Sequence, residues 1–465
     1  MLLKLEKTLF YIFLFLIPFQ IRIFLRNGGN EWNSMFLYLG DVIFMAVLLL
    51  AILRKGIKFE KKDIFLLIFV AVAGISLFAT SSLGISAFRL IKLIEFALLY
   101  IYISSNFKIR NPKPETRNDF FNRILSVIFY SGVLQAILAV AQFVGQGSIG
   151  IKFIEAGIFS PNSPGVANFI LDGEKIMRSY GSFLHPNVLA GFILLTIFCV
   201  YKLLIGNPKS EALNPKQIQT SKLKIQNLLF IVGYLLLVFG LFLTFSRTAI
   251  AVFEAISLLF FLVEFFKLRK IEHAEQRLVD GKKLIKLFLL FVIACILSVA
   301  ILFPYIKARF FTISLEEQAV DLRFFYNKMA IQMIKEKPVL GTGIGNFVNY
   351  SQNYPAYLRA ASKMLGISGE IPQWIYQPVH NIYLLIASEI GVLGLVVFLG
   401  FVVITLLDWF KACFLPARHS LRHQALAGGF LVFGFLIIAL ADHYFWTLQS
   451  GGLMFWLVLA LTKKE

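Results

Sequence analysis

The chain has 465 residues, of which 58% are hydrophobic and 15% are charged, and its formal net charge is +19. A soluble globular protein carries roughly a quarter charged residues, so this composition excludes a soluble protein with a buried core. The apolar residues fall in long runs, many of them near the roughly 20 residues that span a bilayer. The basic residues collect in alternate loops, which argues against a nucleic-acid partner. We therefore predict an all-α, polytopic membrane protein.

Length and hydropathy predict about 12 transmembrane helices. They are expected near residues 8–25, 35–53, 63–80, 86–104, 120–145, 186–205, 227–244, 247–266, 285–304, 380–409, 425–441 and 447–462. A large, partly helical extracytoplasmic loop at 305–379 separates helices 1–9, within 1–304, from helices 10–12, within 380–465. A smaller outer loop covers 146–185. Loops of this length are usually functional.

The distribution of loop charge predicts the orientation. Every second loop is basic, and Lys463-Lys464 lie near the end of the chain; the basic loops cover 54–62, 108–117, 209–224, 267–283 and 418–422. Basic loops face the cytoplasm, so both termini are expected there. Lys4 and Lys7 precede the first apolar segment and no small-residue cleavage site follows it, which favours a retained helix.

A His-Asn pair stands where the large loop re-enters an apolar helix, at His380-Asn381. Nine residues later come Gly391 and Gly394, which we expect in register on that same helix. Imidazole is the side chain best suited to move a proton near neutral pH, so His380 is a candidate base. A local role at the helix terminus remains the alternative.

The sequence does not favour a metal site. The two other outward-facing histidines, His185 and His443, are dispersed, and the outward-facing histidines form no His-x-x-x-His pair. The three cysteines fall in spans or at the inner face, so neither a disulfide framework nor a thiolate zinc site is expected.

Two arginines are candidates for binding an anion. Arg247 lies in the short outer turn Ser246-Arg247-Thr248, where an arginine costs free energy unless it is paired or binds an anion. Its planar guanidinium fits phosphate oxygens in a two-point contact, although pairing with Glu254 is an alternative. Arg323 belongs to an amphipathic helix expected on the outer surface and ended by Pro338. A position at the level of the lipid headgroups is its alternative role.

The segment Gly341–Phe347 contains three alternating glycines. No strand precedes it and no Lys-Ser/Thr follows it, so we favour a tight turn over a phosphate-binding loop.

Further polar residues accompany the outer ends of the spans. Arg178 precedes a span in which Pro186 fits the first turn, and Asn187 is placed to hydrogen-bond across helices or to touch a sugar. Arg89 and Lys92 share a helix face with Glu95. They would either extend a basic funnel or pair with Glu95.

Four segments together resemble the O-antigen ligase and polymerase superfamily of bacterial membrane glycosyltransferases. They are Gly181–Asn187, Ser246-Arg247-Thr248, Arg323 through the Gly341–Phe347 turn, and His380-Asn381 with nine residues to Gly391-x-x-Gly394. The last pattern is the most specific of the four. The span number and the large outer loop before the last three spans fit the same resemblance.

The resemblance implies an enzyme that uses an undecaprenyl-pyrophosphate-linked glycan as donor. Such enzymes act at the outer face of the bacterial inner membrane and use no metal, nucleotide or cofactor. By resemblance, His380 would activate an acceptor hydroxyl, while Arg247, Arg323 and Arg178 would hold the pyrophosphate. The supporting residues would be Asn381, Arg89, Lys92, Asn187 and Asp442.

Three related functions remain open: ligation to a lipid or other surface acceptor, polymerisation of repeat units, and transfer to protein hydroxyls. We favour ligation because the His380 pattern is of the ligase type. A lipid or solute transporter is the alternative of another class. It would place polar residues along a path through the helices, and the absence of a clear repeat between the two halves weakens it.

Overall fold

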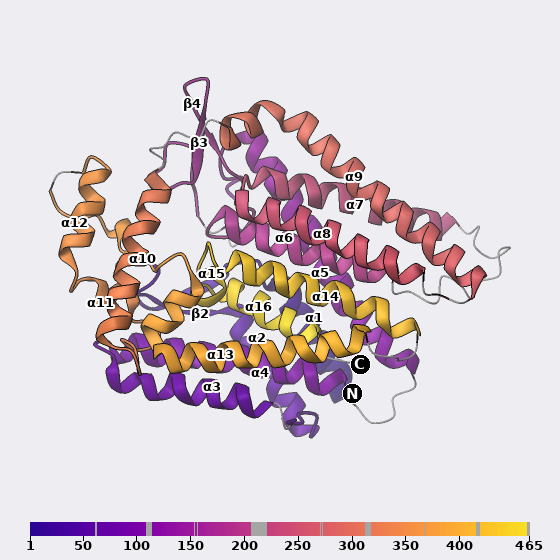
Figure 1. The fold of residues 1–465 in the computed structure, drawn as a ribbon, viewed down its shortest axis with the longest axis horizontal. Coiled ribbons are helices and arrows are strands. Elements are labelled where there is room, and N and C mark those ends of the chain that lie inside the picture. Colours follow the sequence, from indigo (N-terminus) through magenta and orange to yellow (C-terminus); the bar gives the residue numbers. More distant parts are fainter. Residues whose placement is uncertain are drawn as a thin grey trace.

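The computed structural model describes residues 1–60, 63–107, 114–152, 154–155, 157–205, 221–269, 271, 273–311, 318–367, 369–414 and 419–462. In this part of the chain the fold is a bundle of roughly parallel and antiparallel helices with two short hairpins (Figure 1). Parts of the basic loops on which the orientation rests lie outside the described residues, namely 61–62, 108–113, 206–220, 270, 272, 415–418 and the terminal 463–465.

Each of the expected spans overlaps a helix. The helices are α1 (Leu2–Leu16), α2 (Leu39–Leu53), α3 (Asp63–Ile75), α4 (Leu83–Phe107), α5 (Pro114–Gly145), α6 (Pro186–Ile205), α7 (Ser221–Leu243), α8 (Arg247–Leu268), α9 (Ala274–Phe310), α10 (Gln318–Glu336), α11 (Phe347–Ser351), α12 (Pro355–Met364), α13 (Ile382–Phe414), α14 (His419–Ile438), α15 (Tyr444–Thr447) and α16 (Gln449–Leu461). Among the described residues, 5 helices are long and apolar enough to cross a membrane by length and composition. The span number of 12 stays a prediction.

The structure adds two β-hairpins to the fold that was predicted to be all-α. Strands β1 (Arg22–Arg26) and β2 (Met35–Tyr38) pair antiparallel, as do β3 (Asn168–Leu171) and β4 (Glu174–Met177). The first expected span, 8–25, is therefore wrong at its end, because α1 stops at Leu16 and Pro18 cannot continue the helix. The apolar residues of β1 extended the hydropathy signal beyond the helix.

The β3–β4 turn had a sequence signal that we missed. Asp172-Gly173 joins the strands, and both residues have positive φ, 51° and 87°. This is the conformation that a two-residue type I′ hairpin requires, and Asp-Gly is among its preferred sequences.

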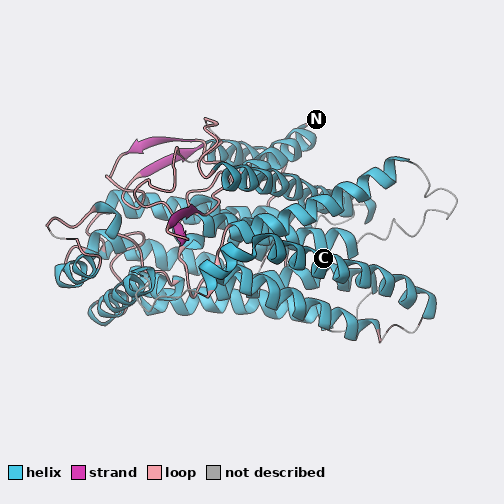
Figure 2. Ribbon diagram, turned by 90° about the horizontal axis from the view of Figure 1, so that it is seen from above, coloured by secondary structure: helices cyan, strands magenta, loops and turns pink. Residues whose placement is uncertain are grey.

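The loops and short elements that carry polar side chains gather at one end of the bundle. The helices α10–α12 and both hairpins lie there, and both termini lie well away from that end (Figures 1 and 2). Helix α9 also reaches this end, because it continues beyond the expected span through Pro304 to Phe310.

Helix α6 occupies the centre of the bundle and supports the site. It is apolar all round, and 83% of its most hydrophobic window is buried inside the protein. A helix that is hydrophobic on every side is stable only where other helices surround it. It contacts α5, α7, α8, α14 and α16, so its first turn, at Pro186 and Asn187, is held firmly at the polar end.

A break in α13 corrects the prediction that Gly391 lies in register on one continuous helix. Gly391 has φ 80° and ψ 170°, which no helical residue adopts. The expected tight turn at Gly341–Phe347 is confirmed and packs into this break. Thr342 N–H donates to the carbonyl of Ser388 at 2.9 Å and Gly343 N–H to that of Glu389 at 2.8 Å. The turn thereby satisfies backbone groups that the interrupted helix leaves open.

Gly391→Ala tests this junction. A Cβ at position 391 would lie 1.9 Å from the carbonyl oxygen of Val339, and this backbone region costs a non-glycine residue roughly 1–3 kcal/mol. We expect a lower melting temperature and a lower yield of monodisperse protein. Gly400→Ala is the matched control, because Gly400 lies on the same helix with nothing within 4 Å. Equal melting temperatures for the two variants would contradict the packing of the Gly341–Phe347 turn into the break at Gly391.

Cysteine labelling tests the orientation. In a chain whose 3 native cysteines are replaced by alanine, Lys58→Cys and Asn162→Cys place a thiol at exposed positions of two different loops. The loop-charge rule predicts that a membrane-impermeant maleimide labels position 162 from the outside and position 58 only after the membrane is opened. The reverse pattern would place the polar end of the bundle in the cytoplasm.

Candidate active site

A cavity of about 1290 Å³ opens at the polar end of the bundle. Its lining comes from both hairpin regions, the start of α6, α8, the end of α9, α10 and the loops that precede α13 and α15. Six of the residues predicted from the sequence line it, namely His380, Arg247, Arg323, Arg178, Asn187 and Asp442. The two other outward histidines, His185 and His443, line it as well. Residues far apart in sequence thus meet in one cavity.

One wall of the cavity is strongly basic. Lys307 and Arg309, at the end of α9, join Arg178, Arg247 and Arg323 there. The sequence interpretation missed Lys307 and Arg309 because it ended that span at residue 304 and assigned them to the large loop. The continuation of α9 places them beside Arg247, whose guanidinium donates to the carbonyl of Arg309 at 2.6 and 3.2 Å. Five cationic side chains in one cavity favour an anionic ligand.

Arg178 is the most deeply buried of these cations. Its side chain donates to the carbonyl of Thr244 at 2.7 Å and to Oδ1 of Asn187 at 2.6 Å. Burial, together with the positive charges of Arg309 and Arg323, lowers the pKa of Arg178 to about 9. An anion beside these groups would relieve that repulsion, so the arrangement favours anion binding.

Asn187 links Arg178 to Asp442 by hydrogen bonds. Its Nδ2 donates to Oδ2 of Asp442 at 2.7 Å, and the backbone N–H of His443 donates to Oδ1 at 2.8 Å. Burial would raise the pKa of Asp442, but the neighbouring histidines and the Asn187 hydrogen bond outweigh it and lower the pKa to about 2. Asp442 is therefore a fixed, ionised carboxylate among the histidines.

His380 lies against His443 and Tyr326. The His380 and His443 rings meet nearly at right angles with centroids 4.7 Å apart, and Tyr326 stacks on His380 at 6.0 Å. Burial lowers the pKa of His380 well below 6.5, and His443 and Arg323 add to that effect. The imidazole is therefore neutral at physiological pH. Its Nδ1 is buried and has no hydrogen-bond partner among the described residues.

The other two histidines use their Nδ1 atoms locally. Nδ1 of His185 accepts a hydrogen bond from the backbone N–H of Asn187 at 3.1 Å, at the start of α6. Nδ1 of His443 pairs with Oγ1 of Thr447 at 2.8 Å. His380 is thus the histidine of this group whose Nδ1 has no hydrogen-bond partner among the described residues.

Comparison with known families agrees with the geometry. Residues 232–399 match the family model described as O-antigen ligase. Over this segment the chain is similar to the O-antigen ligase superfamily. The chain matches no curated protein.

The match covers part of the residues that line the cavity. Residues 232–399 include Arg247, Arg323, His380 and the Gly391 break. Arg178, Asn187 and Asp442 lie outside that range, yet they line the same cavity. The family and the apolar helices together identify a multi-pass membrane protein of the O-antigen ligase-like glycosyltransferase type.

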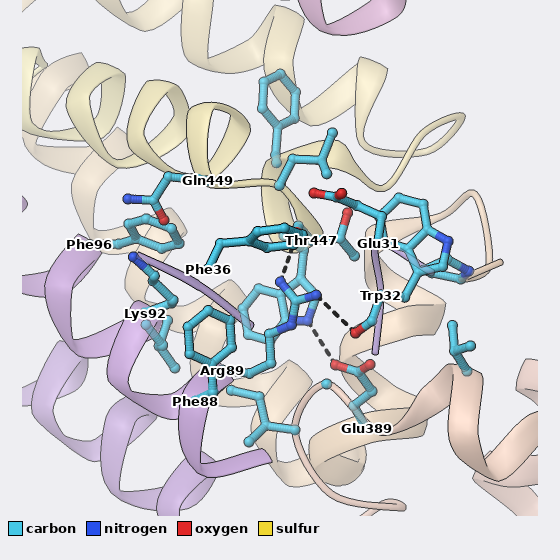
Figure 3. A pocket seen from close by; sticks show the side chains of 18 of the residues that line it. Glu31, Trp32, Phe36, Phe88, Arg89, Lys92, Phe96, Glu389, Thr447 and Gln449 are labelled. Carbon is cyan, nitrogen blue, oxygen red and sulfur yellow. Dashed lines mark hydrogen bonds between the residues drawn. The ribbon is translucent and has the colours of Figure 1, made fainter. Parts of the chain in front are cut away.

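Arg89 and Lys92 lie in a neighbouring, smaller pocket of about 50 Å³ (Figure 3). Lys92 pairs with Asp41, and with Glu95 at 3.1 Å. Arg89 donates to the carbonyls of Thr447 at 2.7 Å and Trp32 at 3.1 Å. The expected alternative, pairing with Glu95, is therefore seen for Lys92. Both basic side chains hold the elements around the ligase cavity together.

Asn381 caps α13. Its Oδ1 accepts a hydrogen bond from the N–H of Leu384 at 3.0 Å, and its Nδ2 donates to the carbonyl of Leu440 at 3.2 Å. The side chain thereby satisfies one open amide of the first turn and ties the start of α13 to the end of α14. In this ligase fold, Asn381 fixes the position of the residue before it, which is His380.

Proposed function

We propose that the protein transfers a glycan from an undecaprenyl-pyrophosphate donor to an acceptor hydroxyl at the outer face of the bacterial cytoplasmic membrane. One observation carries the proposal: a neutral histidine with an unpartnered ring nitrogen shares a cavity with five basic side chains. The family assignment supports the same class of chemistry.

The basic wall fits the donor's leaving group. As the bond between the anomeric carbon and the phosphate oxygen breaks, the electron pair remains on the lipid pyrophosphate. Preorganised cations that face this developing charge lower the barrier without rearranging during the reaction. Arg247, Arg323 and Arg178 hold the pyrophosphate in this proposal, and Lys307 and Arg309 add to the field. These side chains supply charge stabilisation in place of a divalent cation, so the reaction proceeds without metal or cofactor.

His380 fits the role of general base. The acceptor oxygen forms its bond to the anomeric carbon, and its proton moves to the unpartnered nitrogen of His380. The pyrophosphate and the ionised Asp442 favour the imidazolium that results, so the base strengthens when the donor is bound. His443 contacts His380 and keeps its ring in place.

Ligation remains the favoured reaction among the three that use this donor. The His380 pattern is of the ligase type, and the matched family model carries the same description. Polymerisation and transfer to protein hydroxyls are the alternatives. Against a transporter, the basic side chains that line the cavity lie together at one end of the bundle.

Replacing His380 tests the base. We expect His380→Ala to retain folding and donor binding but to lose transfer by roughly 10²-fold or more, the scale of acid–base assistance. His273→Ala is the matched control, because His273 lies in the basic loop before α9. Transfer is measured with purified protein, a lipid-pyrophosphate glycan and an oligosaccharide acceptor. Near-normal turnover by a folded His380→Ala protein would show that His380 is not the general base, and His443 and Asp442 would then be the candidates for that role.

The pH profile gives an independent test of the same base. A neutral imidazole is required, and the pKa of His380 lies well below 6.5 in the free protein. We therefore expect kcat/KM, which reports the free enzyme, to stay constant as the pH falls to 6.5 and to decrease only below it. A decrease centred at or above pH 6.5 would contradict a buried, neutral base.

Arg323→Lys and Arg247→Lys test the basic wall. Both changes keep the charge but lose the planar two-point contact with phosphate oxygens. We expect the KM for the donor to rise about tenfold or more while the KM for the acceptor stays constant. Arg359→Lys, an exposed position on α12, is the control. Donor kinetics equal to the control would show that the two arginines serve the fold only.

A further inference from the structure

The cavity has a second side whose chemistry differs from that of the basic wall. Trp32 and Glu31, from the β1–β2 connection, line it together with Gln377 from the loop before α13. Trp32 and Glu31 also border the smaller pocket, where their side chains lie next to each other (Figure 3). An indole, a carboxylate and an amide provide an apolar face and hydrogen-bonding groups.

A row of ring contacts separates this side from the basic wall. The Trp32 ring meets His443 edge-on at 5.0 Å, and His443 meets His380 at 4.7 Å. His380 in turn stacks on Tyr326, which lies one helical turn after Arg323 on α10. His380 therefore stands between Trp32 and Arg323. A group bound at Trp32 and a group bound at Arg323 approach the base from different directions.

The carboxylate of Glu31 is held in place and neutralised. Arg22 pairs with both of its oxygens, with Nη2 donating to Oε2 at 2.9 Å, and stacks over the Phe36 ring at 3.8 Å. The side chain of Glu31 remains 24% exposed. A carboxylate has about four acceptor positions, so it can accept hydroxyl hydrogen bonds beside its arginine. Because Arg22 balances its charge, it does not repel a polyanionic donor nearby.

Trp32 is fixed through its backbone. Its N–H donates to Oδ1 of Asn30 at 3.1 Å, and its carbonyl accepts from Arg89 at 3.1 Å. The indole is thus presented by a rigid turn, which lowers the entropy lost when a ligand stacks on it. Gln377 donates its Nε2 to the carbonyl of Trp374 at 2.7 Å, which orients its amide oxygen as a further acceptor.

We propose that Trp32, Glu31 and Gln377 form the subsite for an uncharged acceptor sugar. The C–H face of the sugar ring stacks on the indole, and its hydroxyls donate to Glu31 and Gln377. This inference rests on the proposed transfer and names its acceptor as a glycan. A serine or threonine of a polypeptide acceptor has no ring face to stack, so it would gain little from Trp32.

The test separates acceptor binding from donor binding. In full-length protein in lipid nanodiscs, we expect Trp32→Ala to raise the acceptor KM about tenfold, while Trp32→Phe keeps most of the stacking. The donor KM stays constant in both variants. Glu31→Gln replaces the carboxylate with a weaker hydrogen-bond acceptor, so it is expected to raise the KM for the acceptor sugar as well. The matched control is Phe78→Ala, because Phe78 is 90% exposed and lines neither pocket.

A binding measurement makes the result independent of turnover. Titration calorimetry with a panel of neutral oligosaccharides is expected to show binding to the unchanged protein and to Phe78→Ala but not to Trp32→Ala. If oligosaccharide binds in this pattern but no transfer occurs, the subsite stands and the proposed function fails. If transfer occurs and Trp32→Ala leaves the acceptor KM unchanged, the function stands and the subsite is rejected. The subsite would also be rejected if a serine-containing peptide served as acceptor as well as an oligosaccharide does. The same holds if oligosaccharide bound neither to the unchanged protein nor to any variant.

Discussion

The interruption of α13 at Gly391 is the constraint on which the site depends. An open backbone group in an apolar surrounding is costly, so a broken helix persists only where another segment satisfies it. The turn at 338–345 does this on both sides of the break, since Val392 N–H also donates to the carbonyl of Pro338 at 2.8 Å. Added Cβ atoms at Gly341 and Gly391 would overlap backbone atoms of the opposite segment. The glycines of the Gly341–Phe347 turn and Gly391 therefore belong to the same junction between the turn and α13.

This junction sets the relative positions of the chemical groups. The turn follows α10, which carries Arg323, and the broken helix begins just after His380, so the same backbone contacts place both residues. Glu389, next to the break, accepts hydrogen bonds from the N–H of Phe347 at 3.3 Å and from the indole of Trp446 at 2.9 Å. Trp446 lies on α15, which begins at the residue after His443. A change at the break would thus move His380, Arg323 and His443 together.

The sequence predicted much of the fold and the candidate site, and the errors have physical reasons. Hydropathy located the helices because apolar length is the dominant signal of membrane proteins. It failed at β1, where a strand continues the same apolar run, and at Lys307 and Arg309, where α9 extends past its apolar part. Arg178, Asn187 and Asp442 could be named individually, but their hydrogen-bonded chain depends on α6 meeting the α14–α15 loop. The role of Trp32 had no local signal, because it depends on contacts between residues more than 400 positions apart.

The basic wall of the cavity and the side formed by Glu31 and Trp32 come from different parts of the chain. This division suggests how the same transfer reaction serves different acceptors. Arg247, Lys307, Arg309, Arg323 and His380 all lie within the segment that matches the family model. Glu31 and Trp32 lie far outside it, on a hairpin connection where Trp32 contacts His443 and Arg89. In the proposed reaction, donor binding and proton transfer need a fixed geometry, whereas the acceptor needs only to present one hydroxyl to His380. A surface loop tolerates substitution better than the packed helices do. The β1–β2 connection can therefore vary with the acceptor sugar while the Gly391 junction, the basic wall and the base stay unchanged.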